Sequence, residues 1–497
     1  MKKKITLVNT VSAAIAQLAT IANGFIIPWL IIGTFGSEAN GLTQSLRQFL
    51  YYVALFEGGI KNIVVASLYS PLVKKDYAKI SSIIKTSNLF FKKISIVLTA
   101  YSLILAIIYP LIVNTPFSYE YVASLAVIIA SKLFLQYCFT VTIQGLLCAD
   151  KKTAYVSNIQ TITLILEAVI SAIIVKTVPN LHLLKIVSAL VFTIQPILFW
   201  RYARKNYPIQ KNAVVDKKLL KSRWDGVAIS VAEFIHQNTD IMIITVFLGL
   251  GEASIYAVYS LVVTGIKQIC QSLWKALTPS IGKTYASGDI GCLNDKFNVF
   301  EYLSLILTLF SFSVAGLLIT PFVQLYTSNI ADMDYSRPLF GLMMVLAEGM
   351  YILREPYMNL AYCAGKFKDI RIHAIIETII NVVVSLSLVK PLGLVGIAIG
   401  TLLAMTYRTF YHVWYLRKHI INRPFSTFLH KFFAFALPTL ALITLCSFVL
   451  PLNNPTIVSW ILYAIIYSAI FGAAYTIVSI VFFRKELREL KAYIKHK

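Results

Sequence analysis

The amino-acid sequence predicts an all-α protein that crosses a membrane many times. Of its 497 residues, 58% are hydrophobic, the mean hydropathy is +0.74, and the apolar residues occur in runs long enough to span a bilayer, which takes ~20 residues. A formal net charge of +23 would suggest nucleic-acid binding in a soluble protein. Here the basic residues lie between the apolar runs, so a membrane topology explains the charge and we expect no nucleic-acid partner.

Fourteen apolar runs are predicted to be transmembrane spans. They cover residues 9–33, 41–70, 88–113, 119–148, 153–176, 181–202, 225–248, 253–282, 298–320, 337–364, 370–389, 392–416, 429–450 and 456–483. The first run follows three lysines, as in a signal peptide. Because Asn9, Gln17 and Asn23 interrupt it and no small-residue cleavage site follows, we interpret it as a retained span.

The loop charges predict the orientation of these spans. Of the 45 lysines and arginines, 34 lie in the two terminal segments and in every second loop, whereas Lys176, Arg337 and Lys390 alone lie on the opposite side. Positive residues mark the cytoplasmic side. We therefore expect a multi-pass protein of the bacterial cytoplasmic (inner) membrane with both termini in the cytoplasm.

The chain is predicted to contain two repeats. Glu38-Ala39 after the first span matches Glu252-Ala253 after the seventh, and Asp76 after the second matches Asp289 after the eighth, at offsets of 214 and 213 residues. The expected domains are an N-terminal lobe of six spans, a basic cytoplasmic linker, a C-terminal lobe of six spans, and two further spans with a basic tail. Their ranges are 1–202, 203–224, 225–417 and 418–497. Both lobes then insert the same way up, a plan that places a transported substrate between repeats.

Fifteen of the charged residues that fall within the predicted spans are singled out. The basic ones are Arg47, Lys61, Lys132, Lys185, Lys267, Lys275, Arg354 and Arg408. The acidic ones are Glu57, Glu167, Glu233, Asp240, Glu348, Glu355 and Glu377. A charged side chain in lipid costs at least ~2.5 kcal/mol, so a water-filled cavity or buried ion pairs must accommodate them. We interpret Lys185, near a span end, as reaching toward the membrane surface.

The span at 224–248 combines a membrane-crossing length with one polar face. Glu233, His236, Gln237 and Asp240 are spaced i, i+3, i+4 and i+7, which places them on one side of a helix. Such groups bind H⁺ or Na⁺, so they predict ion coupling; a polar packing seam between helices is the alternative. The candidates for ion coupling are Asp240, Glu233, His236, Glu377 and Glu57.

Short motifs spread along the chain resemble those of one transporter family. They are Asn40-Gly-Leu42, Phe49-Leu-Tyr-Tyr52, Phe56-Glu-Gly-Gly-Ile60, Trp224-Asp-Gly226, Phe234–Asp240, Arg354-Glu-Pro-Tyr357, Glu377–Asn381, Gly393–Thr401 and Tyr407-Arg408-Thr409. The chain resembles the Wzx-type flippases of O-antigen, capsule and exopolysaccharide repeat units, polysaccharide transporters of the multidrug/oligosaccharidyl-lipid/polysaccharide (MOP) exporter superfamily. The resemblance covers nearly the whole chain and rests on diffuse patterns rather than on one diagnostic motif.

The resemblance implies a fold and a function. It implies a V-shaped pair of six-helix lobes around a central cavity, and two additional C-terminal helices. It also implies alternating-access transfer of undecaprenyl-pyrophosphate-linked oligosaccharide from the cytoplasmic to the outer leaflet, coupled to H⁺ or Na⁺. We further expect a monomer that contacts a polysaccharide polymerase and needs no cofactor.

The basic residues within spans suit a pyrophosphate substrate. Arginine binds phosphate oxygens with a planar fork and lysine binds them as a point charge. The candidates for contact with pyrophosphate are Lys61, Lys267, Arg354, Lys275, Arg408, Arg47 and Lys132. For each of them, a structural ion pair with an acidic residue of a span is the alternative.

Three other functions stay open at this point. A lipid II flippase also has fourteen spans, and a drug or metabolite exporter belongs to the same superfamily. A membrane-bound glycan polymerase or acyltransferase is a candidate of a different class. We expect no enzyme, because the outer loops are short and His236, His373 and His412 have no Ser or Cys partner at a recognisable spacing. The six cysteines lack the spacing of a metal site.

Overall fold

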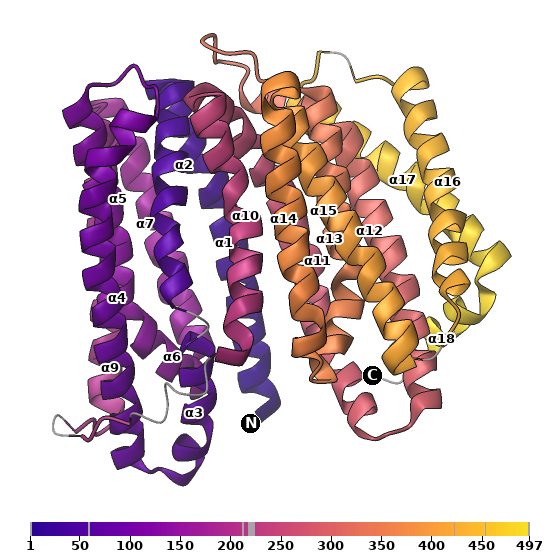
Figure 1. Ribbon diagram of the computed structural model, residues 1–497, viewed down its shortest axis with the longest axis horizontal. Helices are drawn as coiled ribbons and strands as arrows, with labels where there is room; N and C mark the ends of the chain where they lie inside the picture. Colours follow the sequence, from indigo (N-terminus) through magenta and orange to yellow (C-terminus); the bar gives the residue numbers. More distant parts are fainter. Residues whose placement is uncertain are drawn as a thin grey trace. The chain divides into compact units, whose positions relative to one another are not determined.

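The described part of the chain is built from helices and contains no strand (Figure 1). The computed structural model describes residues 2–57, 60–210, 213–216, 224–421, 423–452 and 454–495. Backbone contacts divide the chain into two compact units, Met1–Ile255 and Tyr256–Lys497.

The first unit contains ten α-helices and two short irregular turns within its described residues. They are α1 (Lys2–Phe35), α2 (Ser37–Tyr51), η1 (Tyr52–Phe56), α3 (Ile60–Lys74), α4 (Tyr77–Ile112), α5 (Tyr119–Leu135), η2 (Gln136–Thr140), α6 (Val141–Ala149), α7 (Thr153–Thr177), α8 (Leu181–Phe192), α9 (Ile194–Asn206) and α10 (Trp224–Phe247). The start of α11 also belongs to this unit.

The second unit contains the remaining helices of the described chain. They are most of α11 (Leu250–Ala286), α12 (Ile290–Tyr326), α13 (Pro338–Cys363), α14 (Phe367–Leu392), α15 (Leu394–Leu416), η4 (Arg417–Ile421), α16 (Phe425–Val449), α17 (Ile457–Phe482) and α18 (Arg484–Lys495). Within this unit, α13 packs between α12 and α15, α14 lies along α15, and α16 and α17 cover α12.

Eleven helical segments of the described residues are long and apolar enough to cross a membrane, which confirms the predicted all-α polytopic fold class. The predicted spans at 41–70, 225–248 and 337–364 are not among the eleven. The first is shared between α2, η1 and α3. For the second, the apolar stretch found is the shorter Asn238–Phe247. The third is α13, a 26-residue helix whose three charged residues lower its hydropathy.

The two sequence repeats begin their helices with the same local chemistry. Gly36 precedes α2 with φ 87°, and Gly249 precedes α11 with φ 92°, a backbone conformation that glycine adopts without strain. Asp76 and Asp289 cap α4 and α12, each accepting a 2.9 Å hydrogen bond from the backbone N–H three residues later. The matching motifs therefore correspond to matching helix starts.

Equivalent positions of the two repeats also meet within the first unit. Asn40 and Ser254 are 214 residues apart, and Asn40 Nδ2 donates to Ser254 Oγ at 2.8 Å in a buried site. Beside them, a Cβ added to Gly41 would lie 1.8 Å from the carbonyl oxygen of Leu250. Glycine at position 41 therefore allows α2 to touch the first turn of α11.

The chain after α9 is tied to α4. Lys79 Nζ lies 2.6 Å from Asp216 Oδ2, Ser82 Oγ donates to the carbonyl of Val214 at 2.6 Å, and the Asp216 N–H donates to Thr86 Oγ1 at 2.8 Å. These contacts attach the described part of the predicted linker to the first unit.

Three prolines lie inside continuous helices, although proline within a helix removes a backbone hydrogen bond. Pro28, Pro279 and Pro356 are accommodated in α1, α11 and α13. Near Pro196, by contrast, the chain breaks between α8 and α9 at Thr193. Proline in the first turn of α9 is compatible with the helix because the N–H groups there have no partner within the helix.

Candidate functional site

The second unit buries a group of three charged side chains. Glu377 of α14 accepts a hydrogen bond from Arg354 of α13 on one carboxylate oxygen and from Arg408 of α15 on the other. All three side chains are about 1% exposed or less. Two guanidinium groups on one carboxylate leave an excess positive charge inside the helix bundle.

Small residues bring α14 and α15 close enough for this arrangement. A Cβ on Gly400 would lie 2.4 Å from Ser385 Oγ, and one on Gly396 would lie 2.3 Å from the carbonyl oxygen of Leu388. The buried Asn381 Nδ2 then donates to Thr401 Oγ1 at 2.9 Å across the same contact. Close packing at small residues is typical of helix pairs in membranes. The sequence signal for this contact was the spacing of Gly396 and Gly400: residues four apart lie on one face of a helix.

A second, more accessible charge pair lies on the neighbouring face of α13. Lys267 Nζ of α11 lies 2.9 Å from Glu348 Oε2, and the two side chains are 13% and 21% exposed. The ring of Tyr351 lies beneath both Lys267 Nζ, at 3.8 Å, and Arg354 Cζ, at 4.3 Å, within the range of cation–π attraction. Gln271 donates to Glu355 Oε1 at 2.8 Å. The α11–α13 contact thus adds a paired lysine to the buried arginines.

The histidines of α14 and α15 have aromatic and backbone partners. His373 Nδ1 lies 2.7 Å from the Tyr407 hydroxyl, and its ring stacks on Tyr411 at 3.3 Å. His412 is fully buried and its Nδ1 lies 2.8 Å from the carbonyl oxygen of Arg408. Each histidine therefore has at least one partner on its own helix or the neighbouring helix.

The first unit has a charge site of its own. Lys132 Nζ of α5 lies 2.7 Å from Glu167 Oε1 of α7 and 2.9 Å from Ser188 Oγ of α8. Asn23 of α1 approaches the other carboxylate oxygen at 3.5 Å. The Lys132 side chain is 36% exposed and that of Glu167 is 12% exposed. Four helices therefore meet at one lysine–carboxylate pair.

Three other predicted substrate-binding residues are basic and solvent-accessible. Arg47, Lys61 and Lys275 have exposed side chains, although all three fall well within predicted spans. Arg47 Cζ lies 5.6 Å from the centre of the Tyr51 ring. Glu57 is partly buried and accepts a 3.4 Å hydrogen bond from the Tyr137 hydroxyl.

The predicted ion-coupling residues of α10 are only partly described. Asp240 is 6% exposed, and its neighbour Thr239 exchanges a 2.9 Å hydrogen bond with the Tyr52 hydroxyl of η1. The side chains of Glu233 and His236 lie outside the described residues. Among the side chains that are described, no group of three His, Cys, Asp or Glu residues could hold a metal ion.

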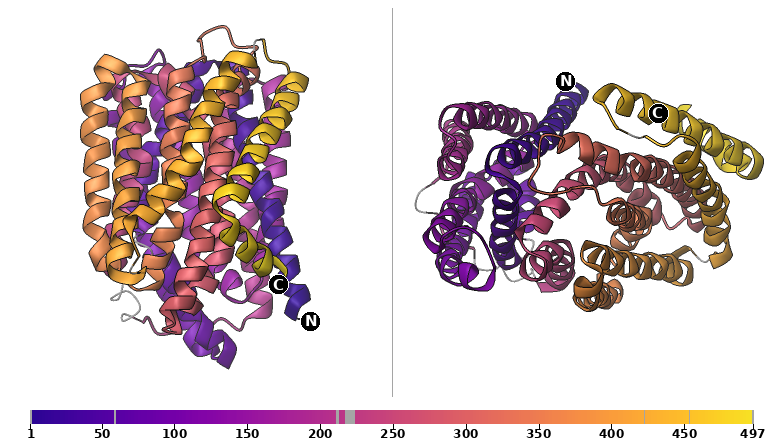
Figure 2. Two further views of the ribbon diagram at one scale, coloured as in Figure 1. Left: turned by 90° about the vertical axis from the view of Figure 1, so that its right-hand side faces the viewer. Right: turned by 90° about the horizontal axis from the view of Figure 1, so that it is seen from above.

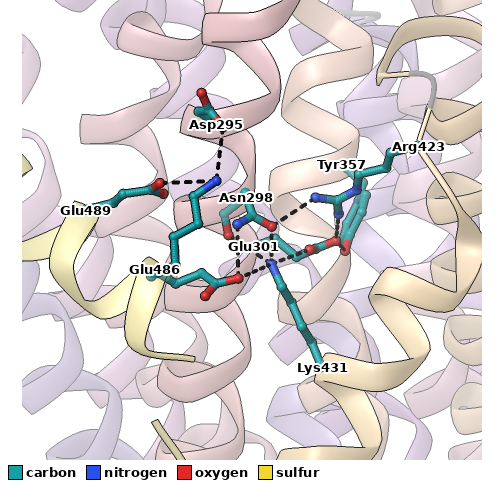
Figure 3. A network of polar contacts seen from close by, with 9 residues as sticks. Asp295, Asn298, Glu301, Tyr357, Arg423, Lys431, Glu486 and Glu489 are labelled. Atoms are coloured by element: carbon teal, nitrogen blue, oxygen red, sulfur yellow. Dashed lines mark hydrogen bonds and ion pairs between the residues drawn. The ribbon is translucent and has the colours of Figure 1, made fainter. Parts of the chain in front are cut away.

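One polar network was missed by sequence reasoning (Figure 3). Glu301 of α12 is 1% exposed and accepts hydrogen bonds from the Tyr357 hydroxyl and from Arg423. Lys431 of α16 donates to its second oxygen at 3.0 Å. Asn298 contributes a further contact to Lys431. Glu301 lies inside the predicted span at 298–320, so its charge was the available signal; its partners come from segments far away in the sequence.

Known proteins resemble this chain in structure. No protein-family model matches the chain, and no curated protein matches it. Solved structures do match. The structure of lipid II flippase MurJ in an inward closed conformation has a TM-score of 0.70, covering 97% of this chain and 100% of that chain at 14% identity.

Transporters of the MOP superfamily match as well. An inward-facing multidrug resistance MATE family transporter has a TM-score of 0.64 at 14% identity, covering 83% of this chain and 99% of that chain. An outward-facing one has a TM-score of 0.60 at 13% identity, covering 86% and 97%. At such low identity the likeness concerns the fold. The chain therefore shares the helical fold of these transporter structures.

Proposed function

We propose that this protein is a flippase for undecaprenyl-pyrophosphate-linked oligosaccharide repeat units, moving them from the cytoplasmic to the outer leaflet by alternating access. The observation that carries the proposal is the set of exposed basic side chains within predicted spans, Arg47, Lys61 and Lys275. Facing lipid tails, each would cost at least ~2.5 kcal/mol. A water-filled path that receives a compact anion accounts for both their exposure and their charge.

The paired cations support the same substrate. The Lys132–Glu167 and Lys267–Glu348 pairs are partly exposed, so a phosphate oxygen can replace the carboxylate as the partner of the lysine. A hydrogen bond to a charged group contributes about 1.5–3 kcal/mol. The buried arginines around Glu377 add positive potential beside Lys267.

The fold likeness favours a lipid-linked substrate over a soluble one. The MurJ structure aligns over 97% of this chain, and the MATE structures over 83–86%. MurJ is a lipid II flippase, so lipid II is the second candidate substrate. A MATE-like exporter of cations would gain nothing from exposed lysines and arginines. A polymerase or acyltransferase is disfavoured because the matching fold belongs to transporters.

We propose the remaining properties from the charge distribution and the resemblance. Both termini and the basic linker lie in the cytoplasm, the protein resides in the bacterial cytoplasmic membrane as a monomer, and it passes its product to a polysaccharide polymerase. H⁺ or Na⁺ drives the cycle. Among the charged residues on the predicted coupling face of α10, Asp240 has a described side chain, and that side chain is buried.

Two complementation assays test the proposal. The chain is expressed in a host that lacks its own repeat-unit flippase and, separately, in a host depleted of its lipid II flippase. We expect restored surface polysaccharide in the first host and no rescue of growth in the second. Rescue of the second host alone would replace the proposed substrate with lipid II. Failure in both, with normal protein levels in the membrane and with flippases matched to other repeat units active in the same assay, would contradict the proposal.

A further inference from the structure

Helix α18 directly follows the last of the long apolar helices. It begins at Arg484, two residues after α17 ends at Phe482. The 26 residues of α17 form a helix ~39 Å long, enough to cross a hydrocarbon core of ~30 Å. Phe483 interrupts the helix with φ −130° and ψ 41°, and α18 leaves α17 at an angle (Figure 2). A membrane-spanning α17 would place the start of α18 near the lipid headgroups.

One side of α18 is fixed to the rest of the second unit. Glu486 accepts a 3.0 Å hydrogen bond from Asn298 Nδ2 of α12 and lies 3.7 Å from Lys431 Nζ of α16. Leu490 packs against the aromatic cluster that includes Phe435. These contacts join α18 to the network around Glu301 (Figure 3), and they determine which side of the helix faces the bundle.

The opposite side of α18 is a stripe of basic residues. With about 100° per residue, positions 484, 488, 491 and 495 fall within ~60° of one another on the helix surface, and position 486 lies ~200° from position 484. The stripe consists of Arg484, Arg488, Lys491 and Lys495. The side chains of Arg484 and Arg488 are exposed, and those of Lys491 and Lys495 lie outside the described residues. Each of the two acidic residues of the helix has a partner. Glu486 contacts Asn298 and Lys431 of the bundle, and Glu489 lies 3.6 Å from Lys485 of the same helix.

We propose that this stripe binds the headgroups of anionic phospholipids in the leaflet that α18 borders. Basic residues close to a membrane surface are attracted to anionic lipids, and each contributes roughly fivefold to binding. Acidic proteins and nucleic acids would bind the same charges, but lipid headgroups adjoin the helix by its position. Lipid binding would also hold Glu486 against Asn298 and Lys431, which links lipid composition to the network around Glu301.

Hydrogen exchange on the full chain tests this proposal without requiring the transported substrate. The protein is placed in nanodiscs of phosphatidylcholine alone and of phosphatidylcholine with phosphatidylglycerol. We expect phosphatidylglycerol to slow amide exchange in residues 484–495 of the native chain severalfold, and we expect high salt to weaken the effect. The combined variant R484Q/R488Q/K491Q/K495Q should lose the response to phosphatidylglycerol.

Two further variants make the test specific. A matched variant, K74Q/K75Q/K151Q/K152Q, removes four exposed lysines from other segments predicted to be cytoplasmic and should respond as the native chain does. R484K/R488K keeps the charge and should also respond. If phosphatidylglycerol leaves the amide exchange of residues 484–495 in the native chain unchanged, the proposal is overturned, whether or not the glutamine variant folds α18. Equal slowing in the glutamine variant, or slowing by a soluble acidic peptide but not by phosphatidylglycerol, would overturn it as well.

Discussion

Glu377 lies between two arginines, and all three side chains are buried. Removing one partner of a buried ion pair is more costly than never having formed the pair, because the remaining charge keeps its desolvation penalty. Here the loss of the carboxylate would leave two guanidinium groups, Arg354 and Arg408, facing each other. Glu377 therefore carries more of the stability of the second unit than a surface glutamate would.

We expect Glu377→Gln to destabilise the purified protein by ~3–5 kcal/mol, measured as thermal unfolding in detergent. The matched control is Glu348→Gln, which removes the same charge from a partly exposed pair and should cost much less. Equal losses in the two variants would contradict the special position of Glu377.

The pair of Lys267 and Glu348 allows a structural role to be separated from substrate contact. If Lys267 binds pyrophosphate, Lys267→Glu combined with Glu348→Lys restores the pair but moves the cation, so the protein should reach the membrane while surface polysaccharide stays absent. If the pair only stabilises the fold, the double exchange should restore the function that each single exchange removes. Complementation together with immunoblotting of membranes gives the answer.

At the scale of elements, the glycines of α15 allow this helix to lie close against α14. Gly396 and Gly400 leave no room for a side chain on the face toward α14. Glu377 of α14 and Arg408 of α15 pair across the same two helices.

Gly400→Ala should destabilise the protein by about 1–3 kcal/mol through overpacking. The added methyl group would meet the backbone nitrogen of Ser385 at 2.9 Å, which a rotamer change cannot relieve. Gly33→Ala in α1 is the control, because nothing lies within 4 Å of its Cβ position, and it should be neutral or slightly stabilising. Both are compared by thermal unfolding; a neutral Gly400→Ala would show that α14 and α15 can separate without cost.

At the scale of the whole molecule, the distribution of loop charges fixes a testable topology. In a background with all six native cysteines replaced by serine, a cysteine at Gln210, which is exposed, should resist an impermeant thiol reagent in intact cells and react after lysis. A cysteine at Asp332, between α12 and α13, should react in intact cells. Labelling of position 210 from outside would contradict the predicted cytoplasmic linker and termini.

Ion coupling is also a property of the whole transport cycle. An ion biases the cycle only if its affinity differs between the two open states. Asp240→Asn keeps the shape of the side chain and removes its charge. In proteoliposomes we expect transport by this variant to lose its dependence on an imposed pH or Na⁺ gradient while glycolipid binding is kept. A variant that responds to both gradients as the native protein does would exclude Asp240 as the coupling residue.

The candidate site could be predicted from the sequence only in part. A charge within an apolar run is visible in the sequence because its cost in lipid is high wherever it faces, and this identified Lys132, Lys267, Arg354, Glu377 and Arg408 as special. Their partners were not visible, since each pair joins different helices. The same limit explains why Glu301 and Lys431 were overlooked: both lie in the first turn of a predicted span, and their partners come from other helices.

The sequence by itself determined the fold class, the approximate positions of the spans and the repeated helix starts at Gly36, Gly249, Asp76 and Asp289. These features depend on local properties: the length of apolar runs, backbone conformations open to glycine, and capping by the side chain at the helix start. Only the tertiary structure decided which charges are paired and which are exposed. Pairing depends on how closely helices distant in the chain approach, and that distance is set by packing at residues such as Gly396 and Gly400, whose effect appears only when the helices are together.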